Sequence, residues 1–198
     1  MPRPRILSSW GRLYRALKDA FPAGDYFFGR SFESYTEDAS GVTAIFSDGG
    51  TAQGDLIIGA DGIRSTVRAQ MLPDAQPQYA GYIAWRGLVP QSVLARPLEP
   101  PAQLFIGIER MFMRYHVRHG SLVNVVAVAR SDGWTDEGWM IPSTIEELRA
   151  QYAGWHEDIL DTIRHLPPAQ CFKWAIHVRE ALPRWQQGNV VVAGDAAH

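Results

Sequence analysis

Two aspartates stand at the ends of short apolar runs, in the segments DLIIGADG (55–62) and NVVVAGDAAH (189–198). Each run passes into small residues before it reaches Asp61 or Asp195. The carboxyl ends of parallel strands are where open α/β sheets bind ligands, and small residues let a cofactor or another backbone come close. A carboxylate there can accept hydrogen bonds from sugar hydroxyls or from backbone amides. A single Asp-Gly pair is more often an ordinary turn, but the repetition favours one ligand cleft built from both strand ends.

Two arginines follow the first of these aspartates. Arg64 and Arg68 fall at the beginning of a helix predicted over 64–72, which Pro73 closes. Guanidinium groups at these positions can offset the charge of Asp61 and attract a phosphate. The alternative interpretation is that both arginines belong to the solvated face of a surface helix.

The elements that would position these residues follow from the spacing of the apolar side chains. An apolar stripe from Trp10 to Phe21 predicts a helix, with Ser8 or Ser9 as its N-cap and Pro22 as its stop. Short strands are predicted at 26–29, 42–47 and 51–59, the last two joined by a tight hairpin at 48–50.

The middle of the chain is richer in aromatic and β-branched residues, in short runs that are typical of an antiparallel sheet. Helices are predicted over 144–152 and 155–166, the first with Ser143 as N-cap and Glu146 at the third helical position. Strands are predicted at 79–89, 103–108, 113–117, 121–129 and 172–178, and a buried parallel strand at 189–193.

This order of elements indicates an α/β fold with an α+β insert. A nucleotide-binding layer interrupted by a substrate-binding layer accounts for it economically. We therefore expect a partial cofactor-binding domain over 1–75, a β-rich substrate-binding domain over 76–180, and a return to the first domain over 181–198.

Composition excludes several classes of protein. The chain has a net charge of −2 and no basic block, which argues against nucleic acid as a partner. Its longest apolar runs are far too short to span a bilayer. A single cysteine, Cys171, leaves no internal disulfide and is typical of a reducing cytoplasm. No group of Cys and His has the spacing of a zinc site, so we expect no metal.

Longer motifs make the interpretation specific. GADGIRSTVR (59–68) and GDAAH (194–198) resemble the two FAD motifs of class A flavoprotein monooxygenases, in the same order. YAGYIAWRGLVP (79–90) resembles the start of the substrate domain in the salicylate- and hydroxypyridine-hydroxylase branch. The resemblance covers nearly the whole chain. It implies a Rossmann-like FAD domain of the glutathione-reductase type and an antiparallel-sheet substrate domain.

The resemblance also implies the chemistry. FAD would be reduced by NADPH or NADH, and a flavin C4a-hydroperoxide formed with O2 would hydroxylate a small aromatic substrate, phenolic or hydroxypyridine-like. Asp195 would hold the ribityl chain, and Gly194 would allow the close approach. The residues implied near the ribose and pyrophosphate are Asp61, Gly62, Arg64 and Arg68.

The implied substrate wall consists of Trp85, Arg86, Met111, Met113 and Tyr115. Their alternative interpretation is ordinary sheet core. Some ring hydroxylases carry a histidine at the position of Met111, where it helps to deprotonate the phenol, so this sequence leaves the catalytic base unassigned.

The sequence departs from the family pattern at both ends. It stops at His198, before the proline- and glycine-rich helix whose N-terminus faces the isoalloxazine in the family. The strand–GxGxxG–helix unit that cradles the FAD pyrophosphate is missing. We therefore expect the chain to be the middle of a longer protein, inactive alone, with a homodimer as a further expectation for the full-length protein. Two alternatives stay open, namely a family member that performs epoxidation, N-hydroxylation or halogenation, and a truncated remnant without catalysis.

Overall fold

The computed structural model describes residues 10–134, 138 and 140–198, without the side chain of Trp10. The expected N-caps Ser8 and Ser9 lie outside this range. The chain divides into two compact units, one of Met1–Ala20 with Tyr79–Ile176 and one of Phe21–Gln78 with His177–His198. Among the described residues, no helix has the length and apolar character needed to cross a membrane.

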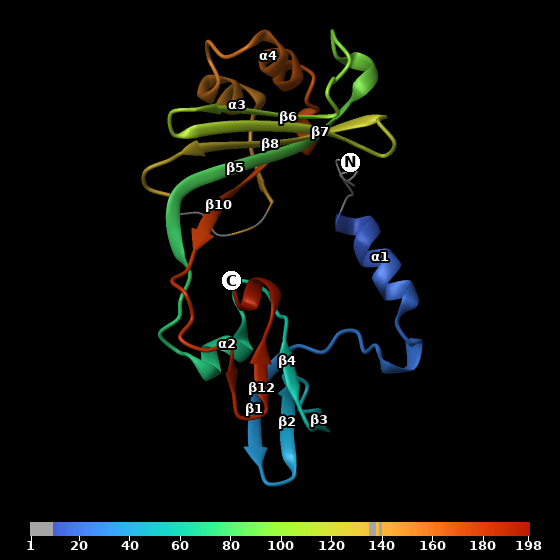
Figure 1. Cartoon of the computed structure of the whole chain (residues 1–198), viewed down its shortest axis with the longest axis vertical. Coiled ribbons are helices and arrows are strands. Elements are labelled where there is room, and N and C mark those ends of the chain that lie inside the picture. The colour runs from blue at the N-terminus through green and yellow to red at the C-terminus, as the bar shows by residue number, and fades with distance from the viewer. Residues whose placement is uncertain (1–9, 135–137, 139) are drawn as a thin grey trace, which may run out of the picture. The chain divides into compact units, whose positions relative to one another are not determined.

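The first unit is built on one six-stranded sheet with the order β6-β7-β8-β5-β10-β9 (Figure 1). Strands β5, β8, β7 and β6 pair antiparallel, as the aromatic and β-branched runs predicted. The observed bounds are β5 Gln78–Pro90, β6 Ala102–Gly107, β7 Arg110–Val117, β8 Leu122–Arg130, β9 Ile141–Pro142 and β10 Phe172–Val178.

Two helices, α3 (Ile145–Gln151) and α4 (Glu157–Arg164), cover one face of this sheet (Figure 1). Phe112 from the sheet meets Tyr152 from the end of α3 edge to face, with ring centroids 5.3 Å apart. The other buried side chains of this core include Ile159 and Ile163 from α4. The opposite face of the sheet is not covered by α3 or α4, and we call it the helix-free face in this sense (Figure 1).

The cap of α3 differs from the prediction by one residue. The N-cap is Thr144, whose hydroxyl accepts from the amide of Glu147 at 3.0 Å. Ser143 was the expected cap, but its hydroxyl is already bonded to two side chains. It donates to Glu147 Oε2 at 2.7 Å and accepts from Trp85 Nε1 at 2.9 Å.

The second unit contains two three-stranded sheets and helix α2 (Thr66–Met71). One sheet is antiparallel in the order β1-β2-β3, and the other has the order β11-β12-β4. The predicted hairpin joins β2 to β3, with Gly49 at φ +79° and the Gly50 amide donating to Asp48. The bounds are β1 Phe32–Asp38, β2 Gly41–Phe46, β3 Thr51–Gly54, β4 Ile57–Gly59, β11 Gln186–Gln187 and β12 Val190–Val192.

Two strand predictions were wrong. Residues 26–29 form no strand, because Phe27 and Phe28 are exposed and have no neighbouring strand, and the strand lies further on as β1. The single run predicted over 51–59 is two strands that belong to different sheets. The chain leaves β3, which pairs with β2, and passes Asp55 and Leu56 before it enters β4, which pairs with β12.

Helix α1 (Trp10–Ala20) confirms the predicted periodicity. Its apolar stripe is largely exposed, however, with Leu13 and Leu17 at 56% and 64%. Four short 3₁₀ turns complete the described secondary structure, namely η1 Ala23–Asp25, η2 Gln91–Val93, η3 Pro168–Gln170 and η4 Gly194–Ala196.

Candidate functional site

The two aspartate-bearing strand ends lie side by side. Strands β4 and β12 pair in parallel, with Gly59 opposite Val192 as the last pair, and the amide of Ala193 donates to the carbonyl of Gly59 at 2.9 Å. Asp61 and Asp195 follow two and three residues beyond that pair, so both loops leave the sheet at the same edge. This is the edge at which parallel sheets bind ligands.

Asp61 organises the loop between β4 and α2. Its carboxylate accepts from the hydroxyl of Ser65 at 2.6 Å and from the amide of Val67 at 3.2 Å. The Ser65 hydroxyl in turn accepts from the amide of Arg68 at 2.9 Å and so caps α2. Sugar hydroxyls and backbone amides were the two donors predicted for this carboxylate, and the structure shows a backbone amide, that of Val67.

Glycine is favoured at three places in β4 and in the loops that follow β4 and β12. A Cβ on Gly59 would lie 2.7 Å from Val67 Cβ, so only glycine lets α2 pack this closely on β4. Gly194 has φ +59°, and a Cβ at this position would meet nothing within 4 Å, so its turn is left-handed and open. Gly62 is similar, with φ +84°.

Arg68 does not lie on a solvated helix face. Its side chain is 1% exposed, and its guanidinium donates to the carbonyls of Ile63 at 2.5 Å and Ala196 at 2.9 Å. Burial, together with the nearby charge of Arg179, lowers the pKa of Arg68. The arginine therefore ties the β4 loop to the β12 loop, whereas Arg64 is exposed.

A second arginine that donates to the β12 loop was not predicted from the sequence. Arg179 donates to the carbonyl of Asp195 at 3.0 Å and to that of Ala196 at 3.1 Å. It lies in an irregular segment after β10, where neither periodicity nor a motif marks it. The sequence therefore held no signal that could have identified it.

Asp195 itself is exposed and is the middle residue of the turn η4. The turn is held by the amides of Ala197 and His198, which donate to the carbonyl of Gly194 at 2.8 and 3.1 Å. No hydrogen bond to the Asp195 carboxylate is found within the part of the chain that the structure describes. Its two oxygens are therefore available to an external donor.

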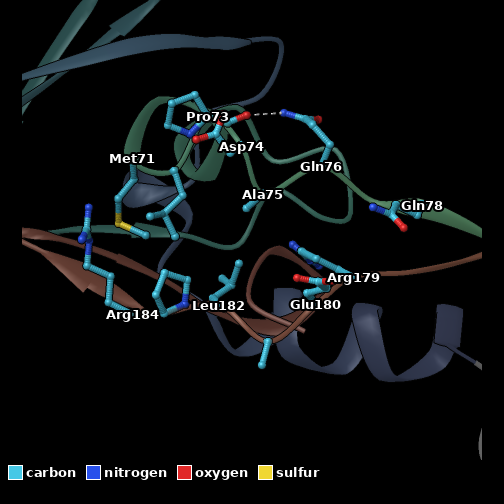
Figure 2. Close-up of a pocket in the computed structure, with 13 residues that line it drawn as sticks. Met71, Pro73, Asp74, Ala75, Gln76, Gln78, Arg179, Glu180, Leu182 and Arg184 are labelled. Carbon is cyan, nitrogen blue, oxygen red and sulfur yellow. Dashed lines mark hydrogen bonds between the residues drawn. The ribbon is translucent and has the colours of Figure 1, made fainter.

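A pocket of about 390 Å³ opens between 71–78 and 179–184 (Figure 2). Its wall includes Met71 and Leu182 as well as the charged side chains of Asp74, Glu180 and Arg184. Charges of both signs surround it, so its lining does not select one class of ligand. Arg179 also lines it and thereby joins this pocket to the Asp195 loop.

Four of the five proposed substrate residues share the helix-free face of the six-stranded sheet. Met111, Met113 and Tyr115 alternate along β7 on this face, opposite the face that holds Phe112. Arg86 on β5 and Met113 on β7 are both paired with Val126 of β8, so they flank the same position. The guanidinium of Arg86 lies 5.7 Å from the ring centroid of Trp174 on β10.

Trp85 lies on the opposite face. It is fully buried in the core below α3 and α4, and its indole donates to Ser143. Strand alternation places neighbouring residues on opposite faces, which separates Trp85 from Arg86. Trp85 is thus part of the sheet core, which was the alternative interpretation for this residue. His116 also faces away from Tyr115, and its Nε2 lies 2.8 Å from Gln91 Oε1.

A parallel strand pair with glycine-bearing turns at its carboxyl edge, in a chain that also carries a large antiparallel sheet, defines an α/β nucleotide-cofactor protein with a β-rich insert. The comparison with known families specifies the class. The FAD binding domain model matches residues 12–198, and the chain belongs to this family. The predicted fold class, α/β with an antiparallel-sheet insert, is thereby confirmed.

Its relatives are monooxygenases. The chain is 35% identical over 196 residues to 3-amino-4-hydroxybenzoate 2-monooxygenase of Streptomyces cremeus, covering 98% of this chain and 48% of the relative. It is 30% identical over 203 residues to salicylate hydroxylase of Pseudomonas putida, covering 92% and 46%. Among solved structures, Klebsiella pneumoniae HpxO complexed with FAD and uric acid matches with a TM-score of 0.83 and 30% identity, over 96% of this chain and 48% of that one. The chain spans about half the length of these relatives.

Proposed function

We propose that this chain is part of an FAD-dependent, NAD(P)H-using monooxygenase that hydroxylates a small aromatic ring carrying a hydroxyl group. The observation that carries the proposal is the parallel pairing of β4 with β12, which brings both FAD-motif loops to one edge of the sheet. The names of the relatives, which act on hydroxybenzoate and salicylate, support the same reaction class.

The residues at this edge suit FAD. Asp195 presents an exposed carboxylate that would accept hydrogen bonds from the ribityl hydroxyls, and Gly194 leaves room for the chain to pass. Asp61 and Gly62 shape the loop that would face the ribose and pyrophosphate, and Arg64 adds an exposed positive charge there. When bound, FAD supplies the electron transfer and the activation of O2. The protein binds and orients the cofactor and the substrate, and it excludes water.

The helix-free face of the sheet is the proposed substrate surface. Met111, Met113 and Tyr115 give it an apolar and aromatic floor, which suits a flat ring. Arg86 is exposed on this face, with Val126 as its uncharged neighbour on β8 and Trp174 beside its guanidinium. A carboxylate or phenolate on the ring would pair with Arg86 through charge-assisted hydrogen bonds. Hydroxybenzoate and salicylate, named for the relatives, both carry such groups.

Two further proposals concern the protein as a whole. We propose a cytoplasmic location, because the single cysteine is buried and unpaired, as is typical of a reducing compartment. We also propose that residues 76–180 form the substrate-binding domain and that 1–75 and 181–198 belong to the FAD-binding domain.

The test uses the full-length gene product. Purified protein should be yellow with the absorbance bands of bound flavin, and small phenols or hydroxypyridines should stimulate NADH or NADPH oxidation with formation of a hydroxylated product. Benzoates and nicotinates that bear a hydroxyl group form the first screening set. A protein that binds no flavin after reconstitution with FAD would refute the proposal. Flavin-bound protein that oxidises NAD(P)H but hydroxylates none of the rings would refute the reaction class alone.

A further inference from the structure

Two guanidinium groups meet at the loop that carries Asp195. Arg68, from α2, and Arg179, from the segment after β10, both donate to the carbonyl of Ala196, at 2.9 and 3.1 Å. Arg179 donates in addition to the carbonyl of Asp195, and Arg68 to that of Ile63. Four hydrogen bonds from charged donors thus converge on the backbone of the two cofactor loops. Hydrogen bonds from charged donors are the stronger kind.

The arrangement is costly as a purely structural device. Within the described residues, the Nε atoms of Arg68 and Arg179 are both buried and have no hydrogen-bond partner. Burial and the like charge of Arg179 lower the pKa of Arg68, and the charge of Asp61 offsets them only in part. Buried donors without partners are uncommon, and local rules are broken mostly at functional sites. A pair of apolar side chains would hold a loop with a smaller penalty.

We propose that Arg179 is a positioning residue for the cofactor, because it fixes the backbone of Asp195 and thereby aims the exposed Asp195 carboxylate. The inference rests on the proposed function, since it assumes that Asp195 binds FAD. Arg179 is suited to this role because its two terminal nitrogens hold two successive carbonyls. The planar guanidinium fixes their relative orientation in a way that the single ammonium of lysine does not. Arg68 supports the same loop through the carbonyl of Ala196.

A double-mutant cycle tests the inference in the full-length protein. FAD is removed, and the dissociation constant for added FAD is measured by flavin fluorescence for wild type, Arg179→Gln, Asp195→Ala and the double variant. Arg179→Gln should weaken FAD binding by about tenfold or more, which is the loss expected for charged hydrogen bonds. In the Asp195→Ala background the same change should add less than about twofold, since the carboxylate that it positions is gone.

Two variants serve as controls. Arg184 lines the same pocket but donates to Gln187 rather than to the Asp195 loop. Arg184→Gln should therefore leave the FAD dissociation constant unchanged within about twofold. Arg179→Lys keeps the charge but can span the two carbonyls less well, so it should fall between wild type and Arg179→Gln. It also provides a measurement if the glutamine variant does not fold.

Amide hydrogen exchange in the flavin-free protein gives an independent readout. Loss of Arg179 should speed exchange at Ala197 and His198, the amides that hold the η4 turn, while exchange in β4 and β12 stays slow. Equal acceleration across both strands with a lower Tm would mean that Arg179 is merely structural, and would overturn the inference. Full additivity in the cycle would overturn it as well. If Asp195→Ala alone leaves FAD binding unchanged, the proposed role of Asp195 fails, and this exchange pattern still decides whether Arg179 holds the loop.

Discussion

The carboxylate of Asp61 offers a quantitative test of how the loop between β4 and α2 is held. Asp61→Ala removes two hydrogen bonds, from the Ser65 hydroxyl at 2.6 Å and from the Val67 amide at 3.2 Å. A net contribution of about 0.5–1.5 kcal/mol for each bond, reduced because Asp61 is exposed, predicts a loss of about 1–2 kcal/mol in the free energy of unfolding. Asp61→Asn keeps one accepting oxygen and should lose about half as much.

The companion variant is Ser65→Ala. It removes the cap on the amide of Arg68 as well as the hydrogen bond to Asp61, and should cost about 1 kcal/mol or somewhat more. Because the two side chains share one hydrogen bond, the double variant should lose less stability than the sum of the two single losses. The difference should be about 0.5–1 kcal/mol.

Urea denaturation of the full-length protein with FAD removed measures all four free energies of unfolding, so that changes in FAD affinity do not contribute to them. An unchanged unfolding midpoint in Asp61→Ala, or strictly additive losses for Asp61 and Ser65, would contradict this account of the loop. FAD affinity separates this role from direct binding. If Asp61 contacts FAD directly, Asp61→Ala should weaken FAD far more than Ser65→Ala does. If it only organises the loop, the two variants should weaken FAD to a similar extent.

Three shorter predictions concern packing, substrate selection and pH. Gly59→Ala should destabilise the protein by about 1–3 kcal/mol, because its Cβ would lie 2.7 Å from Val67, and adding Val67→Ala should recover part of the loss in urea denaturation. Arg86→Gln should raise the KM of a carboxylated ring about tenfold while that of the matching ring without a carboxylate changes little, and equal effects on both would contradict the anion role. Burial disfavours ionised Glu147, but hydrogen bonds from Lys173 and a serine outweigh it and lower the pKa of Glu147. Because the pKa of Glu147 is lower in the folded protein than in the unfolded one, ionised Glu147 stabilises the fold above the unfolded pKa. This stability is lost as pH falls through the folded pKa. Glu147→Gln should therefore flatten the pH dependence of the free energy of unfolding below about pH 4.5.

Local patterns were enough to predict the two strands that end near Asp61 and Asp195. An apolar run that ends in small residues and an aspartate describes both a strand and its exit, and β4 and β12 confirm that interpretation. The sequence could also predict most of the antiparallel sheet, because alternation and β-branched residues determine those strands locally. The residues 26–29 show the limit of this approach. Three aromatics in a row predicted a strand, but a strand needs a neighbour, and the neighbour is decided by distant segments.

Side-chain direction was harder to predict than position in the chain. Arg68 and Arg64 stand four residues apart near one helix, yet Arg68 is buried and Arg64 is exposed. Arg68 is buried because it donates to the carbonyl of Ala196 in η4, which is 128 residues away in the chain. Arg179 donates to the same carbonyl across 17 residues of irregular chain, so no spacing rule could mark it.

Trp85 and Arg86 show the same limit within one strand. A resemblance to a known family identifies both as part of a substrate-domain motif, but alternation allows only one of two neighbours to face a given side of the sheet. The helices α3 and α4 cover the side that holds Trp85, and this leaves Arg86 on the helix-free face with Met113 and Tyr115. A substitution at Trp85 should therefore lower the stability of the protein without changing its substrate preference. A substitution at Arg86 should change which substrate is selected. Measuring the unfolding midpoint and the KM for both variants distinguishes the two roles, and a Trp85→Phe variant that alters substrate preference at unchanged stability would contradict this division of the two faces.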